Sequence, residues 1–162
     1  MKLTALSALT ALLLIVGLGG CATKYQNMGF AGGVKAEPIT NSTFRIVARG
    51  NAYTAGTAIQ DYVLLKAAET AVAAGQTHFA IISEADASSN EIGQTAGSSQ
   101  TNVIGNSAFT TYHPGAVFNI HKPGEDVYIR VFSPKKGEAL PTGAFAADEI
   151  IANIGPRVPR EN

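Results

Sequence analysis

The chain has 162 residues, with 12 Lys or Arg against 12 Asp or Glu, so its formal net charge is zero. This balance excludes a general electrostatic attraction to nucleic acid, and we expect no nucleic-acid partner. Cys21 is the single cysteine, which excludes an intramolecular disulfide and leaves stability to packing and hydrogen bonds.

The N-terminal stretch has the pattern of an export signal. One positive residue, Lys2, precedes an uncharged run of 18 residues that is rich in Leu and Ala and ends in small residues. This pattern predicts a secretory signal peptide over residues 1–20. The alternative is a transmembrane helix, but the run is at the lower edge of the roughly 20 residues needed to span a membrane. The glycines at its end also disfavour a helix.

The next segments predict an arm, a strand, a helix and a second strand. Residues 21–43 hold scattered glycines, which indicates an arm leading into the domain. Residues 44–49 alternate between core-facing and outward side chains, which favours a half-buried strand. Residues 58–74 are Ala-rich and helical, with Thr57 and Gln60 matching a capping box. Residues 78–83 form an apolar strand, so we expect a strand–helix–strand (βαβ) unit.

The rest of the chain is less regular. Residues 86–111 are polar and predict an extended excursion or a mobile loop. Residues 116–121 and 127–133 predict two strands of one hairpin. A short amphipathic helix is expected over residues 144–154, followed by a frayed tail from residue 156 to residue 162.

These elements predict one α+β domain over residues 44–155. We expect two layers, a mixed sheet of about four strands with both helices on one of its faces.

The residues Leu18-Gly19-Gly20-Cys21 resemble the lipobox of bacterial lipoproteins. The resemblance implies cleavage before Cys21 and acyl chains attached to that cysteine. Several acyl chains hold a protein on a membrane without a spanning helix. Ala22 resembles the residue of outer-membrane lipoproteins at this position. We therefore expect an outer-membrane location, facing the periplasm.

Longer stretches of the chain carry a second resemblance. These are Phe44-Arg45-Ile46, Gly50-Asn51-Ala52-Tyr53-Thr54, Leu64-Leu65-Lys66-Ala67-Ala68-Glu69 and Gly75-Gln76-Thr77-His78-Phe79. Together they are similar to a family of small proteobacterial envelope lipoproteins. The chain departs from that pattern at Val34, where an aromatic is common, and at Lys66, where Arg is. The resemblance implies a lipoprotein with one domain, and it implies no particular activity.

The segment that joins the first strand to the helix is the candidate for ligand or partner contact. It contains Asn51, Tyr53 and Thr54, and ligands of open α/β sheets often bind beyond strand ends. The alternative is that Gly50 and Asn51 only form a turn.

The function expected from these patterns is a non-enzymatic binding or structural module, anchored to the membrane by lipid on Cys21. An envelope protein or peptidoglycan is the expected partner, and no cofactor or metal is expected. One alternative is a small hydrolase or metal-dependent enzyme, which requires His113, His121 and Glu84 or Asp86 to converge. Another is a small-ligand carrier, whose cavity would be lined by a set of aromatic side chains. That set is Phe79, Phe118, Tyr128 and Phe132.

Overall fold

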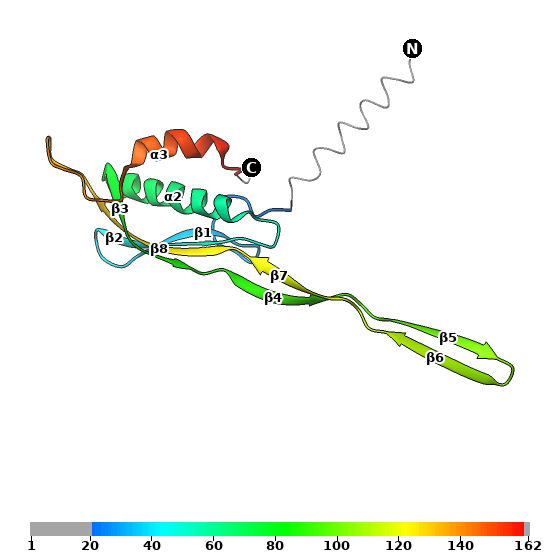
Figure 1. The fold of residues 1–162 in the computed structure, drawn as a ribbon. Helices are drawn as coiled ribbons and strands as arrows, with labels where there is room; N and C mark the ends of the chain where they lie inside the picture. Colours follow the sequence, from blue (N-terminus) through cyan, green and yellow to red (C-terminus); the bar gives the residue numbers. More distant parts are fainter. Residues whose placement is uncertain (1–20, 161–162) are drawn as a thin grey trace, which may run out of the picture.

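The computed structural model describes residues 21–160, so the predicted signal peptide of residues 1–20 lies outside the described part. The elements of the domain are β1 (Gly33–Pro38), β2 (Thr43–Arg49), α2 (Gly56–Ala73), β3 (His78–Asp86), β8 (Gly124–Phe132), β9 (Ala144–Ala146), α3 (Ala147–Ile154) and the short 3₁₀ helix η2 (Gly155–Arg157). A projecting segment, here called the arm, spans residues 89–122. Its strands are β4 (Ser89–Gln94), β5 (Ser98–Ile104), β6 (Ser107–His113) and β7 (Val117–Lys122) (Figure 1).

The domain has the expected α+β character, with both helices on one side of the sheet (Figure 1). The sheet has five strands in the order β1-β2-β8-β3-β9, rather than about four. Every neighbouring pair is antiparallel, so the prediction of a mixed sheet is wrong. Strands β2 and β3 do run parallel and are connected by α2, as the βαβ prediction requires. Strand β8 lies between them and hydrogen-bonds to both, because its unbroken apolar face fits the centre of the sheet.

Helix α2 buries eight residues, and three of them are alanines. Ala68 and Ala71 are fully buried beside Leu65. The helix begins two residues earlier than the predicted capping box at Thr57 requires, since Ala55 is the N-cap and makes no side-chain cap hydrogen bond. A glycine caps the C-terminal end of α2. Gly75 has a positive φ of 71° and its amide donates to the Val72 carbonyl.

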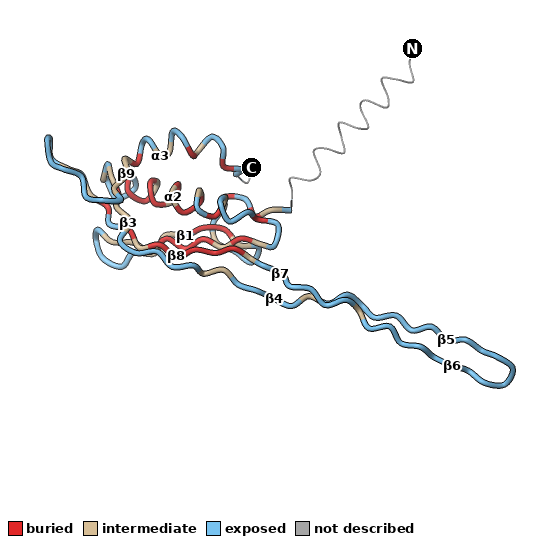
Figure 2. The backbone as a smooth tube through the Cα atoms, in the orientation of Figure 1, coloured by how far each residue is buried: buried red, intermediate tan, exposed pale blue. Residues whose placement is uncertain are grey.

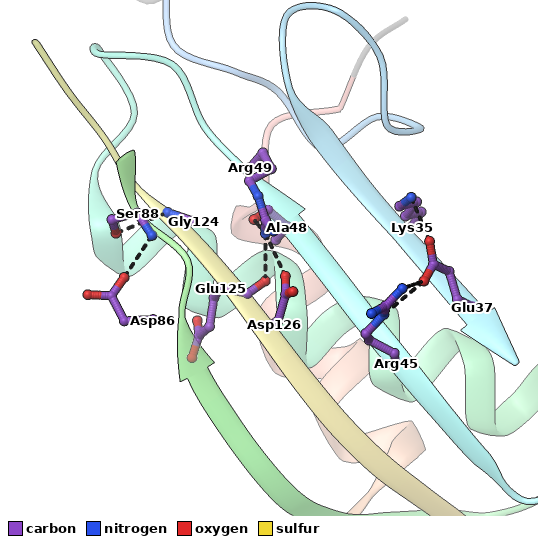
Figure 3. Close-up of polar contacts among 10 residues, drawn as sticks. All are labelled: Lys35, Glu37, Arg45, Ala48, Arg49, Asp86, Ser88, Gly124, Glu125 and Asp126. Carbon is purple, nitrogen blue, oxygen red and sulfur yellow. Dashed lines mark hydrogen bonds and ion pairs between the residues drawn. The ribbon is translucent and has the colours of Figure 1, made fainter. Parts of the chain in front are cut away.

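The core lies between α2 and the sheet and is completed by α3. Phe79 of β3 is fully buried, and its ring stacks on that of Phe145 with centroids 5.5 Å apart. Ile129 of the neighbouring strand β8 and Ile46 of the next strand, β2, are also fully buried. The same strands place charged residues on the opposite face. There Arg45 pairs with Glu37 and Arg49 Nη1 lies 2.7 Å from Asp126 Oδ1 (Figure 3).

The two ends of the described chain are joined to each other. The amide of Tyr25 donates to the carbonyl of Pro159 at 2.8 Å. The Tyr25 hydroxyl donates to Glu69 of α2 at 2.5 Å, and Arg160 bonds to the same carboxylate at 3.0 Å. Burial and the Glu69 carboxylate raise the pKa of Tyr25 above its ordinary value. Residues 156–160 are therefore part of the packed fold, and the prediction of a frayed tail is wrong for them.

Residues 86–111 do extend away from the domain, but the prediction of a loop is wrong, because most of these residues are in strands. Strand β4 pairs with β7 and β5 pairs with β6, which makes a long two-stranded ribbon (Figure 1). The predicted hairpin of residues 116–121 with 127–133 does not form. Its first strand belongs to the arm, and Pro123 alone separates β7 from β8.

Candidate functional site

Cys21 is exposed, and its own backbone is held against the domain. The Asn51 side-chain amide donates to the Cys21 carbonyl at 2.6 Å. Two residues further on, the Thr23 amide donates to Thr54 Oγ1 at 3.0 Å, and the Tyr62 hydroxyl donates to the Thr23 carbonyl at 2.7 Å. Thr23 is buried, with 4% of its surface exposed. The described chain is thus part of the fold from Thr23 onward. The N-terminal segment of residues 21–43, which the sequence predicts to lead into the domain, is therefore folded together with the domain from that residue.

The loop between β2 and α2 is shaped by its own side chains. Asn51 Oδ1 accepts hydrogen bonds from the Tyr53 amide and from the Thr54 hydroxyl, each at 3.0 Å. Gly50 is needed here, because a Cβ at this position would lie 2.7 Å from the Thr54 Cβ. The turn therefore presents Asn51 and Thr54 to the Cys21 segment, while Tyr53 remains 75% exposed.

The three residues predicted for ligand or partner contact lie together beside Cys21. With it they line an open groove of about 760 Å³. Phe118, Ile120 and Lys122 of β7 line the same groove. Cys21 and the root of the arm are therefore neighbours at one end of the domain.

Removal of the Thr54 hydroxyl is expected to loosen the Cys21 segment. In Thr54→Val the buried Thr23 amide loses its acceptor, which costs about 1–3 kcal/mol of stability. Urea unfolding measures this loss, and amide hydrogen exchange at Thr23 should accelerate. Thr57→Val is the matched control, since Thr57 is exposed on the first turn of α2. Equal stability and equal exchange in the two variants would contradict this account of the segment.

The arm is uncharged over nearly its whole length. Residues 92–120 contain no Asp, Glu, Lys or Arg. Every residue of β5 and β6 is exposed (Figure 2). At about 3.3 Å per residue, the 17 residues from Ser89 to Gly105 extend roughly 50 Å. The arm is thus a long neutral ribbon presented to the surroundings.

Glycine and aromatic residues meet across the arm. A Cβ on Gly93 would lie 2.6 Å from the Phe118 ring, and a Cβ on Gly97 would lie 2.5 Å from the Tyr112 hydroxyl. Each aromatic side chain therefore covers the glycine of the opposite strand. The prediction of a loop over residues 86–111 misses this pairing, in which Gly93 of β4 lies directly opposite Phe118 of β7.

A cluster of carboxylates lies on the helix side of the sheet near the start of α2. A bulge between Ile81 and Ser83 changes which β3 side chains face the helix. After it, Glu84 and Asp86 line a pocket together with Glu125 of β8 (Figure 3 shows Asp86 and Glu125). Burial, with help from the neighbouring Glu84 and Asp86, raises the pKa of Glu125 from 4.5 to about 7.

The raised pKa predicts that stability falls as the pH rises. The folded state holds the Glu125 proton more tightly than the unfolded state, so the stabilisation is complete below pH 4.5 and is lost through about pH 7. Glu125→Gln should reduce the stability difference between pH 5 and pH 8 by about 1–3 kcal/mol. Urea unfolding at both pH values measures this, with the exposed Glu138→Gln as control. An unchanged difference in Glu125→Gln would show that the carboxyl titrates normally.

The residues of the alternative functions lie in separate elements. His113 is on β6 and His121 on β7, whereas Glu84 and Asp86 are on β3. Across residues 21–160, no group of three or more His, Cys, Asp or Glu side chains could hold a metal ion. Of the four aromatics proposed to line a carrier cavity, Phe79 is in the core and Phe118 is 47% exposed on the arm.

Within the described residues, neither helix combines the length and the apolar character that crossing a membrane requires. No protein-family model matches the chain, and no curated protein or solved structure matches it either.

Proposed function

We propose that this protein is a lipid-anchored, non-enzymatic module of the cell envelope that binds its partner through the arm. The anchor is lipid on Cys21, and Ala22 favours the outer membrane as its location. The expected partner faces the periplasm and is an envelope protein or peptidoglycan.

The observation that carries the proposal is the position of Cys21 relative to the arm. Cys21 lines the same groove as Phe118 and Lys122 at the root of the arm. A predicted signal peptide that ends just before Cys21 and an exposed ribbon that begins beside Cys21 are what an anchored binding protein needs.

The short connection between Cys21 and the folded domain also supports the proposal. Two residues of extended chain reach about 7 Å, and Thr23 is already buried. A lipid on Cys21 therefore holds the folded domain against the membrane surface with little slack. Binding beyond the domain then depends on the arm and its reach of roughly 50 Å.

Two variants test the two halves of the proposal in the native cells. Cys21→Ala should leave the membrane fraction. The arm-shortened chain, in which a two-residue Asn-Gly turn replaces residues 95–116, should stay in the membrane fraction and lose the complexes trapped by a chemical crosslinker. Leu140→Ser is the control, because Leu140 is an exposed apolar residue outside the arm. An unchanged set of complexes in the arm-shortened chain would contradict binding through the arm.

A further inference from the structure

Both long edges of the arm are open to another strand. Strands β5 and β6 form a two-stranded sheet, and so do β4 and β7. Each strand therefore hydrogen-bonds along one side only within residues 21–160. The other side presents a row of backbone N–H and C=O groups, which is a template for a further strand.

The main sheet of the same protein protects its edges, and the arm does not. Edge strand β1 carries Lys35, Glu37 and Pro38, and the opposite edge strand β9 has only three residues. Charges, proline and short length are the usual means by which proteins prevent edge pairing. Strands β5 and β6 have seven residues each, without charge, proline or a register shift.

The composition of the arm suits pairing with an identical ribbon. Thr101 lies opposite Thr110, and their hydroxyls are 2.8 Å apart. Val103, Phe109 and Tyr112 each have more than 60% of their surface exposed. The pairing of neighbouring strands is stabilised by hydroxyl groups, aromatic rings and β-branched side chains that meet across them. No like charges would face each other when two such arms approach.

We propose that the arms of neighbouring copies of this chain pair edge to edge, with β5 of one copy antiparallel to β6 of the next. This inference rests on the proposed anchor, because copies in one membrane share an orientation. Strands β5 and β6 run in opposite directions, so two arms that lie alongside each other place a β5 edge beside a β6 edge.

Each such contact adds about seven main-chain hydrogen bonds, one for each residue of the strand on average. Anchoring on a common surface also raises the effective concentration of one arm near another. Each copy uses its β5 edge for one neighbour and its β6 edge for the other. The same contact can therefore repeat from copy to copy and yield a ring or a row.

A disulfide between copies tests this pairing in the full chain. Thr101 and Thr110 lie at the same level of the hairpin, so Thr101 of one copy should lie beside Thr110 of its neighbour. We would co-express Thr101→Cys and Thr110→Cys with different tags in the native cells. The mixed dimer should exceed either homodimer at least about fivefold, because a disulfide needs Cα atoms within about 7 Å. Lys136→Cys, on an exposed loop of the domain, replaces one partner as the control.

The outcomes separate the pairing from the anchor. Membrane-bound, lipidated protein without the mixed dimer would overturn the pairing and leave the anchor intact. The mixed dimer in protein that is neither lipidated nor membrane-bound would support the pairing and remove the anchor. Predominant Thr101→Cys homodimers would overturn the β5-to-β6 arrangement. The detergent-solubilised native chain should also be larger than a monomer, and the arm-shortened chain should be a monomer; equal oligomer sizes would contradict pairing through the arm.

Discussion

Phe79→Ala is expected to lower the free energy of unfolding by about 3–5 kcal/mol. The ring is fully buried in β3 and stacks on Phe145, which itself precedes α3. Alanine would remove this contact and leave a cavity where the sheet meets both helices. Since small domains are stable by only about 5–15 kcal/mol, the variant should lose a large part of its stability. Urea unfolding of the purified protein measures the change.

Phe109→Ala is the matched control, since it removes the same side chain from the arm. Phe109 has 61% of its surface exposed, so its loss should change the stability of the domain by no more than about 0.5 kcal/mol. A similar loss of stability in both variants would mean that the arm is part of the core, contrary to the fold described above.

Gly32→Ala is expected to have the second-largest effect on stability. Gly32 has a φ of 94°, in the region that L-residues other than glycine rarely adopt. A Cβ there would lie 2.4 Å from the Arg49 carbonyl oxygen and 3.2 Å from the methyl group of Thr23. The backbone would have to shift, at an expected cost of about 2–3 kcal/mol, since strain of this kind typically costs 1–3 kcal/mol. The shift would also disturb Thr23, so thermal unfolding and hydrogen exchange near Cys21 should both change.

Gly56→Ala tests the same substitution where nothing opposes it. A Cβ on Gly56 meets no atom within 4 Å, and the residue opens α2. Alanine favours the helix, so this variant should be as stable as the native protein or more stable by up to about 1 kcal/mol. If Gly32→Ala behaved in the same way, the close approach of residue 32 to β2 would be wrong.

The core elements could be predicted because their sequence period reflects burial on one side. The alternation of residues 44–49 identified β2, and the helical run after residue 57 identified α2. Strands buried on one face carry this signal whatever their partners are. The order of the strands could not be predicted in this way, because β8 lies between β2 and β3 through contacts between residues that are far apart in the sequence.

The arm could not be predicted from the same signal. Both of its faces are exposed, so Ser, Thr, Asn and Gln occur on either side and no apolar period marks its strands. The predicted hairpin requires a turn between residues 121 and 127, but the backbone continues there almost as one strand from β7 to β8. Composition alone therefore indicated a loop where the chain forms paired strands.

The candidate site was predicted only in part. The position of Cys21 after an apolar run predicts it as the anchor, and the loop with Asn51 and Thr54 was identified from its place between a strand and a helix. Their hydrogen bonds to residues 21–23 depend on the folded positions of segments about 30 residues apart. The nearness of the arm to Cys21 depends on the β4–β7 pairing, which had no sequence signal.

The most direct test of the account is the intact mass of the native protein extracted from cell membranes. We expect a chain of 142 residues that begins at Cys21 and carries the added mass of acyl chains, with Cys21→Ala absent from the membrane fraction. An unmodified chain that begins at Met1 and remains in the membrane would contradict it. In that case residues 1–20 would be a membrane span, and the position of the arm relative to the membrane would have to be derived again.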